Sequence, residues 1–241
     1  MANTIASVAS QEFVYYEHIV VDGLSKDETM DFVRSSPSVT RYLSELDAGI
    51  YDAMNKGIGL ANGDIVGFLN SDDMYADSLV LEKVSQAFED PSVDVCYGDL
   101  VYVSKDNDRV VRYWQSKDFV SNAFGKGWCP AHPTFYVRKS KIAQLGLFDL
   151  SYKLAADVEF MMRYLERGHL KSVYIPHVLV RMRVGGASNQ SWLHIVKQNK
   201  EVLAALRKNN IPFSMFLFFG NKLVSRLWQF VTARLNQKRW S

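Results

Sequence analysis

Cysteine is scarce in this sequence, and its spacing excludes the common cysteine-based metal sites. The 241 residues contain two cysteines, Cys96 and Cys129, which lie far apart and in no metal-ligand pattern. A disulfide framework is not expected from such a pair. We expect two reduced thiols in a cytoplasmic protein.

Charge of one sign and long apolar runs are also lacking. The formal net charge of +2 is too small to indicate nucleic-acid binding, so no nucleic-acid partner is predicted. No stretch reaches the roughly 18 apolar residues that span a bilayer. The first ten residues have neither the basic start nor the apolar run of a signal peptide. These absences favour a cytoplasmic location.

Two common nucleotide-binding motifs are missing as well. Neither a G-x-G-x-x-G segment nor a P-loop occurs anywhere in the chain. Nicotinamide dehydrogenases and P-loop NTPases are therefore disfavoured. Hydrophobic residues make up 48% and charged residues 22% of the chain, which is typical of a globular protein.

Short apolar runs alternate with helical patterns along the chain. Strands are predicted at 17–22, 65–69, 93–97, 100–103, 131–137 and 173–183, and helices at 50–61, 78–88, 139–145, 156–167 and 190–209. This alternation predicts an α/β fold, with a mostly parallel sheet and helices on both faces. Glu159 and Arg163, four residues apart, are predicted to pair on the surface of the helix at 156–167.

Aspartates follow two of the predicted strands. Asp22 ends the first strand, and Asp72 and Asp73 come shortly after the strand at 65–69. Ligands of open α/β sheets bind at the carboxyl ends of strands. Two adjacent carboxylates near an apolar strand are costly unless a cation compensates them, and Mg²⁺ or Mn²⁺ bound to a diphosphate is suited to this. A turn or helix cap is the alternative.

Two further candidates stand alone. Asp157 begins a predicted helix, where the helix dipole favours a negative charge, and it serves either as a catalytic base or as an N-terminal cap. His132 lies between prolines in CPAHPTFYVRK and either contacts a substrate or is structural.

The composition changes near the C-terminus. Residues 211–219 (IPFSMFLFF) are strongly apolar, and no acidic residue follows Glu201 although several lysines and arginines do. This pattern fits an amphipathic segment on the anionic surface of the inner membrane. Packing on the main domain or at a dimer contact is the alternative.

The order of these segments resembles the family 2 glycosyltransferases, especially bacterial members that build exopolysaccharide, capsule or O-antigen. Four segments carry the resemblance, which covers roughly residues 3–190: EHIVVDGLSKDET, SELDAGIYDAMNKGIGLANGDIVGFLNSDD, YGD, and HPTFYVRKSKIAQLGLFDLSYKLAADVEFMMRYLERG. It implies a GT-A fold and an inverting, metal-dependent, hexosyl-type glycosyltransferase. The implied partners are a nucleotide-sugar donor and a saccharide or lipid-linked acceptor.

The resemblance also implies roles for individual residues. Asp157 matches the general base, Asp22 would contact the nucleotide base, and Asp72 and Asp73 stand where the family binds Mg²⁺ or Mn²⁺, with Asn70 replacing a first aspartate. The implied nucleotide-sugar pocket comprises Asp22, Asp47, Tyr51, Asn55, Lys56, Asn70, Ser71 and Asp72. We expect a donor half at 1–118, an acceptor half at 119–190 and a C-terminal helical segment at 191–241.

Two positions depart from the family pattern. The chain starts in a helix (MANTIASVASQ) that in the family follows a first strand, and Val184 stands in MRVGGAS where many members carry a histidine. Either the start of the sequence is misassigned, or the protein is a truncated, catalytically inactive relative that binds nucleotide sugars, which is the alternative prediction.

Overall fold

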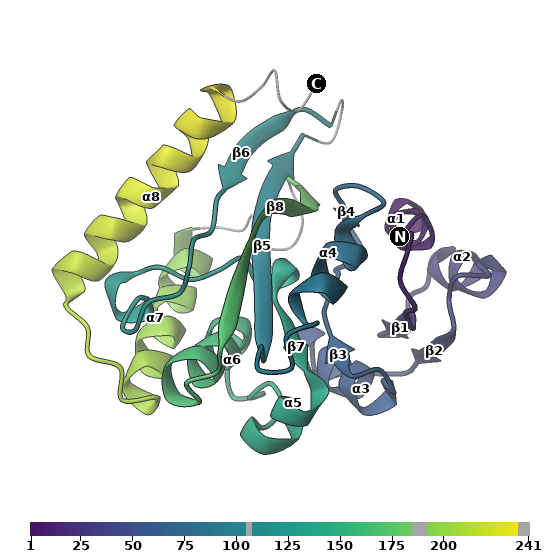
Figure 1. The fold of residues 1–241 in the computed structure, drawn as a ribbon, viewed down its shortest axis with the longest axis horizontal. Coiled ribbons are helices and arrows are strands. Elements are labelled where there is room, and N and C mark those ends of the chain that lie inside the picture. The colour runs from purple at the N-terminus through teal and green to yellow at the C-terminus, as the bar shows by residue number, and fades with distance from the viewer. Residues whose placement is uncertain (105–107, 185–191, 236–241) are drawn as a thin grey trace.

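Two sheets organise the described part of the chain, residues 1–104, 108–184 and 192–235 of the computed structural model (Figure 1). The larger sheet has the strand order β3 (Ile65–Val66), β7 (Tyr136–Arg138), β5 (Val95–Val103), β8 (Ser172–Arg183) and β4 (Asp73–Tyr75), with β6 (Val110–Trp114) paired to β5. The smaller sheet joins β1 (Ile19–Asp22) to β2 (Arg41–Ser44). β1 and β3 do not pair with each other.

Strand directions differ from the prediction of a mostly parallel sheet. β1 with β2 and β5 with β8 are parallel, whereas β3 with β7, β7 with β5, β8 with β4, and β5 with β6 are antiparallel. Apolar runs reveal a strand but not its direction. A short return from β5 forces an antiparallel hairpin with β6, because a parallel crossover needs a dozen or more residues.

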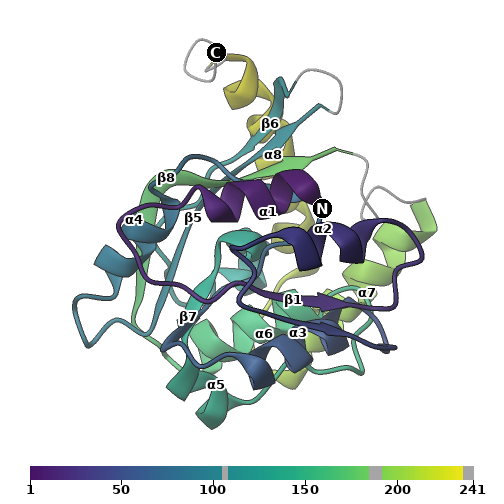
Figure 2. The same ribbon diagram turned by 90° about the vertical axis from the view of Figure 1, so that its right-hand side faces the viewer.

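Helices enclose both sheets, as predicted. They are α1 (Ala2–Ala9), α2 (Thr29–Ser35), α3 (Ile50–Leu60), α4 (Val80–Ala87), α5 (Lys139–Leu145), α6 (Ala156–Met162), α7 (Trp192–Lys208) and α8 (Met215–Leu235), and α6 continues as a π-helical turn over Arg163–Arg167. In Figure 2, α1 and α2 lie on one side of β1 and α3 on the other. Val20 accordingly packs with α1 and α2, while Val21 faces Gly57 of α3, where an added β-carbon would lie 3.5 Å from Val21 Cγ2.

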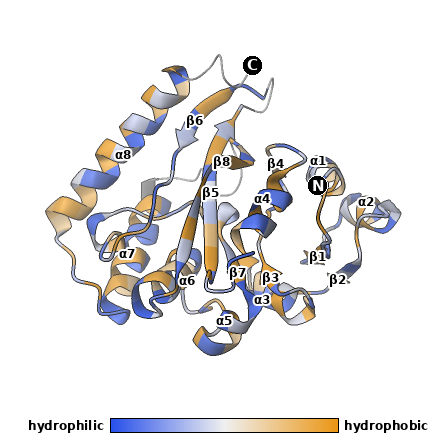
Figure 3. Cartoon of the chain, viewed as in Figure 1, coloured by the Kyte–Doolittle hydropathy of each residue, from blue (hydrophilic) through white to orange (hydrophobic). Residues whose placement is uncertain are grey.

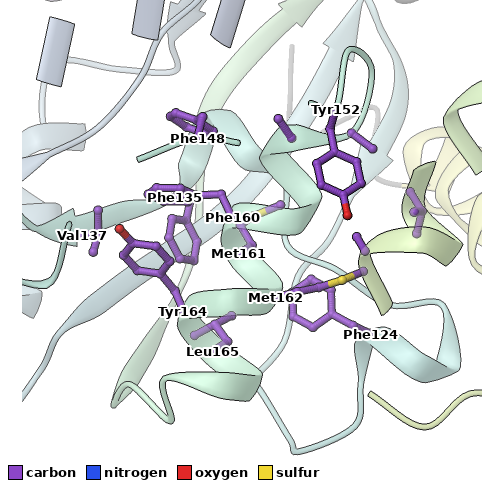
Figure 4. Packing of buried hydrophobic residues seen from close by; sticks show 14 of the residues in the cluster. Phe124, Phe135, Val137, Phe148, Tyr152, Phe160, Met161, Met162, Tyr164 and Leu165 are labelled. Atoms are coloured by element: carbon purple, nitrogen blue, oxygen red, sulfur yellow. The ribbon is translucent and has the colours of Figure 1, made fainter. Parts of the chain in front are cut away.

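The central strand β5 separates two apolar cores. Val95 and Tyr97 face α5, α6 and α7, whereas Cys96 and Leu100 face α4. This alternation follows from the two-residue period of a strand that is buried on both faces. Stacked rings of Phe148, Phe160 and Tyr164 form the centre of the first core, with centroids 4.3 and 4.0 Å apart (Figure 4).

Several predicted boundaries need correction. The strands predicted at 93–97 and 100–103 are one strand, β5, and the strand predicted at 131–137 is a 3₁₀ turn (His132–Thr134) followed by β7. β2, β4 and β6 were not predicted. The helix at 139–145 is confirmed, and residues 190 and 191 of the last predicted helix lie outside the described residues.

Candidate functional site

Asp72 and Asp73 follow β3 but have different surroundings. Asp73 is the first residue of β4, is 2% exposed, and accepts a hydrogen bond from Asn70 Nδ2 at 2.9 Å. Burial raises the pKa of Asp73 to about 6, because a charged carboxylate loses its hydration there. Asp72 lies in the exposed turn. The two aspartates therefore cannot contribute equally to a ligand site.

A hollow of about 210 Å³ lies beside Asp72. It is lined by Met1, Ala2, Asn3, Thr4, Ser71, Asp72 and Arg183. Thr4 Oγ1 donates to the carbonyl of Ser71 at 2.6 Å and fixes α1 against the turn. Arg183 ends β8, and its buried Nε has no hydrogen-bond partner in the described part of the chain. One small hollow thus contains a carboxylate and a guanidinium.

Arg183 was not predicted as a site residue. It reaches the hollow because β8 pairs with β4, which places Asp73 opposite Met182. The one available signal was a basic residue at the end of a predicted strand. Residues 185–188 of the MRVGGAS segment lie outside the described residues.

Asp22 ends β1, and Asp47, which lies in the loop after β2, approaches the neighbouring Gly23. Asp22 accepts hydrogen bonds from the Ser25 N–H at 3.2 Å and the Ser44 hydroxyl at 2.6 Å. Burial opposes the charge of Asp22, but these hydrogen bonds outweigh it and lower the pKa. Gly23 permits the approach of Asp47, since a β-carbon there would lie 2.4 Å from Asp47 Oδ2.

Helix α3 directs its predicted site residues to different places. Tyr51 donates its hydroxyl to Asp157 Oδ1 at 3.0 Å. Asn55 instead holds the backbone of Phe148, accepting from its N–H at 2.9 Å and donating to its carbonyl at 3.0 Å. Lys56 donates to the carbonyl of Leu46 at 2.7 Å. Asn55 and Lys56 thus hold the loops that contain Phe148 and Leu46.

Asp157 lies in the first turn of α6 but does not occupy the N-cap position. Ala155 occupies the N-cap position, and the Glu201 carboxylate accepts the N–H groups of Lys153, Leu154 and Ala155. Asp157 Oδ1 accepts both the Tyr51 hydroxyl at 3.0 Å and the N–H of Val158 at 2.9 Å. Burial together with this carboxylate raises the pKa of Tyr51, so that it stays a donor. Asp157 is therefore not the N-cap residue, but its carboxylate binds one N–H of the first turn as well as the Tyr51 hydroxyl.

His132 is buried close to this carboxylate. Its ring stacks on Phe68 with centroids 5.6 Å apart and meets the edge of Phe148 at 5.7 Å. Burial lowers the pKa of His132 from its ordinary value of 6.5, because the charged imidazolium would lose its hydration. Packing of this kind agrees with a structural role, and Nε2 has no partner among the described residues.

We expect His132 to make the protein less stable in mild acid. The unfolded chain binds a proton below about pH 6.5 while the folded chain resists it, so the free energy of unfolding falls as the pH falls through this range. Urea unfolding of wild type and His132→Phe between about pH 5 and about pH 8, the range that spans the ordinary pKa of histidine, checks this. The variant should show a flatter profile, and equal slopes would contradict the prediction.

The described residues contain no group of three or more His, Cys, Asp or Glu side chains that could hold a metal by themselves. Mg²⁺ and Mn²⁺ in nucleotide sites need fewer protein ligands, since one or two carboxylates and substrate phosphates often suffice. Exposed Asp72, with Asp73 behind it, fits that mode. The buried carboxyl group of Asp73 and the guanidinium of Arg183 determine the electrostatic environment of Asp72.

Comparison with known proteins assigns the family. The model described as glycosyl transferase family 2 matches residues 1–173. This chain belongs to glycosyl transferase family 2. It is 31% identical over 191 residues to a PGL/p-HBAD biosynthesis glycosyltransferase of Mycobacterium tuberculosis, covering 76% of this chain and 72% of the relative. The family predicted from the four sequence segments is thus confirmed.

Solved structures confirm the GT-A fold. TarS of S. aureus in complex with UDP matches with a TM-score of 0.62 at 18% identity, and the match covers 88% of this family 2 chain and 62% of that chain. The mannosyltransferase PcManGT from Pyrobaculum calidifontis, in complex with GDP-Man and Mn²⁺, also has a TM-score of 0.62, at 19% identity over 96% of this chain and 68% of that one. At these identities the likeness concerns the fold alone.

Proposed function

We propose that this family 2 protein transfers a sugar from a nucleotide-sugar donor to a hydroxyl of a saccharide or lipid-linked acceptor, in the synthesis of exopolysaccharide, capsule or O-antigen. The hollow that brings Asp72 and Arg183 together is the observation that carries the proposal. A metal-bound diphosphate needs both a carboxylate for the cation and a cation for the phosphates. The curated relative is itself named a glycosyltransferase.

Binding of the donor would divide between two regions. Asp22 and Asp47 would hold the nucleoside, since Asp22 lies at the carboxyl end of β1 and Asp47 follows β2. Asp72, assisted by Asp73, would ligate Mg²⁺ or Mn²⁺, which when bound neutralises charge on the departing diphosphate. Arg183 would contact the same diphosphate from β8. Asn70 and Ser71 position this turn, since Asn70 binds Asp73 and Ser71 binds Thr4.

Transfer would proceed with inversion. The acceptor oxygen attacks the anomeric carbon as its proton passes to the Asp157 carboxylate, and the bond from carbon to the diphosphate oxygen breaks with its electron pair leaving on the diphosphate. The Tyr51 hydroxyl holds Asp157 in place during this step. The products are the glycosylated acceptor and a nucleoside diphosphate.

We expect donor binding to raise the melting temperature in a metal-dependent way. A ligand at a hundred times its Kd stabilises the folded state by about 2.7 kcal/mol, which raises Tm by roughly 5–10 °C in a chain of this size. A panel of UDP-, dTDP-, GDP- and CMP-sugars with and without Mn²⁺ identifies the base. Asp72→Ala should abolish the shift.

The matched control is Asp31→Ala, which removes an exposed carboxylate from α2 and should leave the shift unchanged. Arg183→Gln should weaken binding of nucleoside diphosphates more than that of monophosphates. A chain that melts cooperatively but responds to no donor would refute the proposal. Binding without turnover would instead support the inactive, nucleotide-sugar-binding relative.

A further inference from the structure

Helix α8 exposes most of its large apolar side chains. The side that packs on the protein buries the apolar Phe218 and Ala233 together with polar groups: Gln229 accepts a hydrogen bond from Arg112 of β6, and Lys222 donates to Asn199 of α7 at 2.7 Å. The side chains that point outward are large and apolar: Phe216 (85% exposed), Leu223 (62%), Val224 (65%), Leu227 (59%), Trp228 (60%), Val231 (45%) and Leu235 (74%). We call these seven residues the outer face of α8.

The outer face is continuous. From Leu223 to Leu235 its members recur at three- and four-residue intervals, and Phe216 lies two turns before Leu223, so they share one side of the helix. Figure 1 places α8 along the edge of the molecule beside β6, and Figure 3 shows apolar residues repeated along its length. Scattered exposed apolar residues are ordinary, but a contiguous stripe of this size marks an interaction surface.

The charges around the outer face indicate its partner. Arg226 and Arg234 are exposed on α8, and the sequence has no acidic residue after Glu201. Two copies packed through this face would bring four arginines together with no carboxylate of α8 to pair them. A surface of anionic lipid supplies both the apolar layer and the negative charge.

We propose that the outer face of α8 docks on an anionic phospholipid bilayer. No helix in the described part of the chain is long and apolar enough to cross a membrane, so α8 lies in the plane of the lipid surface. Leu227 and Trp228 insert among the acyl chains, while Arg226 and Arg234 contact lipid phosphates. This inference is independent of the donor site, because α8 contributes no residue to that site.

Flotation of the full chain with lipid vesicles tests the proposal. The protein should float with vesicles of phosphatidylcholine and phosphatidylglycerol, and not with phosphatidylcholine alone. Leu227→Gln with Trp228→Gln should reduce the bound fraction at least about tenfold, and Arg226→Gln and Arg234→Gln about fivefold each. Raising the salt concentration should release the wild-type protein.

The matched control is Val120→Gln with Leu193→Gln, which removes two apolar side chains that are 56% and 67% exposed elsewhere. This pair should float like wild type. Wild-type protein that fails to float, or α8 variants that float equally well, would overturn the proposal. So would light scattering that shows a dimer dissociated by Leu227→Gln with Trp228→Gln. Donor thermal shifts measured on the same variants distinguish this outcome from failure of the proposed function.

Discussion

Replacement of Asp157 by asparagine is expected to lower kcat by about 10²- to 10⁴-fold. The amide cannot accept the proton of the acceptor hydroxyl, but its oxygen can still accept the Tyr51 hydroxyl at the position where Asp157 Oδ1 does so now, 3.0 Å away. The fold and donor binding should therefore survive. The measurement is the turnover of nucleotide sugar, monitored through the release of nucleoside diphosphate.

Tyr51→Phe provides the comparison for this experiment. It keeps the Asp157 carboxylate and removes the hydroxyl that holds it. We therefore expect a smaller loss of kcat, with Asp157 still acting as the general base. Turnover should be measurable in Tyr51→Phe and far lower in Asp157→Asn. An Asp157→Asn protein that retains wild-type turnover would show that the base lies elsewhere.

The largest effect on stability is expected from Arg163→Met. Glu159 is fully buried and receives hydrogen bonds from Nε and Nη2 of Arg163, the latter at 3.0 Å. The same guanidinium donates to the carbonyls of Leu145, Gly146 and Leu147. Removal of the guanidinium leaves the buried carboxylate to Lys208 Nζ at 3.6 Å and Asn209 Nδ2 at 3.3 Å, and it takes this donor from three carbonyls, which costs about 3–5 kcal/mol.

Urea unfolding monitored by circular dichroism measures this loss. Arg167→Met changes an exposed arginine on the same π-helical turn, and we expect its effect to stay within about 0.5 kcal/mol. Equal effects of the two substitutions would contradict the assignment. Native proteins have about 5–15 kcal/mol of stability in all, so Arg163→Met could leave the chain only marginally folded.

The ion pair of Glu159 and Arg163 also shows where sequence reasoning was wrong. The four-residue spacing correctly predicted their contact, but on the surface, whereas Glu159 is fully buried. Spacing along a helix reports which side chains are neighbours and not what covers them. Here α5, its following loop and Asn209 at the end of α7 supply the cover.

Runs and spacings of apolar residues predicted several strands and helices correctly. The strand at Ile19–Asp22 and the helices at 50–60 and 139–145 follow from runs of apolar residues and from their spacing. β2 and β4 were missed because their sequences, RYLS and DMY, lack an apolar run. Each is a strand because a distant partner, β1 or β8, pairs with it.

The residues of the candidate site also separate into those that local sequence indicates and those that depend on distant partners. Asp22, Asp72 and Asp73 could be proposed because aspartates stand out after apolar strands. Arg183 could not, since its place depends on the register between β4 and β8. The contact between Tyr51 and Asp157 joins residues 106 positions apart, and nothing local in either segment indicates it.

The small sheet of β1 and β2 has a consequence for how a donor would be bound. No strand pairing ties it to the larger sheet, and its contacts in the described structure run through α1, α2 and α3. Such a unit can open without unfolding the rest of the molecule. Because Asp22 and Asp47 belong to this unit, part of the donor's binding energy would be spent on keeping it closed. Amide hydrogens of β1 and β2 should then exchange fast in the free protein and slowly in the bound one, and donor affinity would be adjustable through packing at Val20 and Gly57.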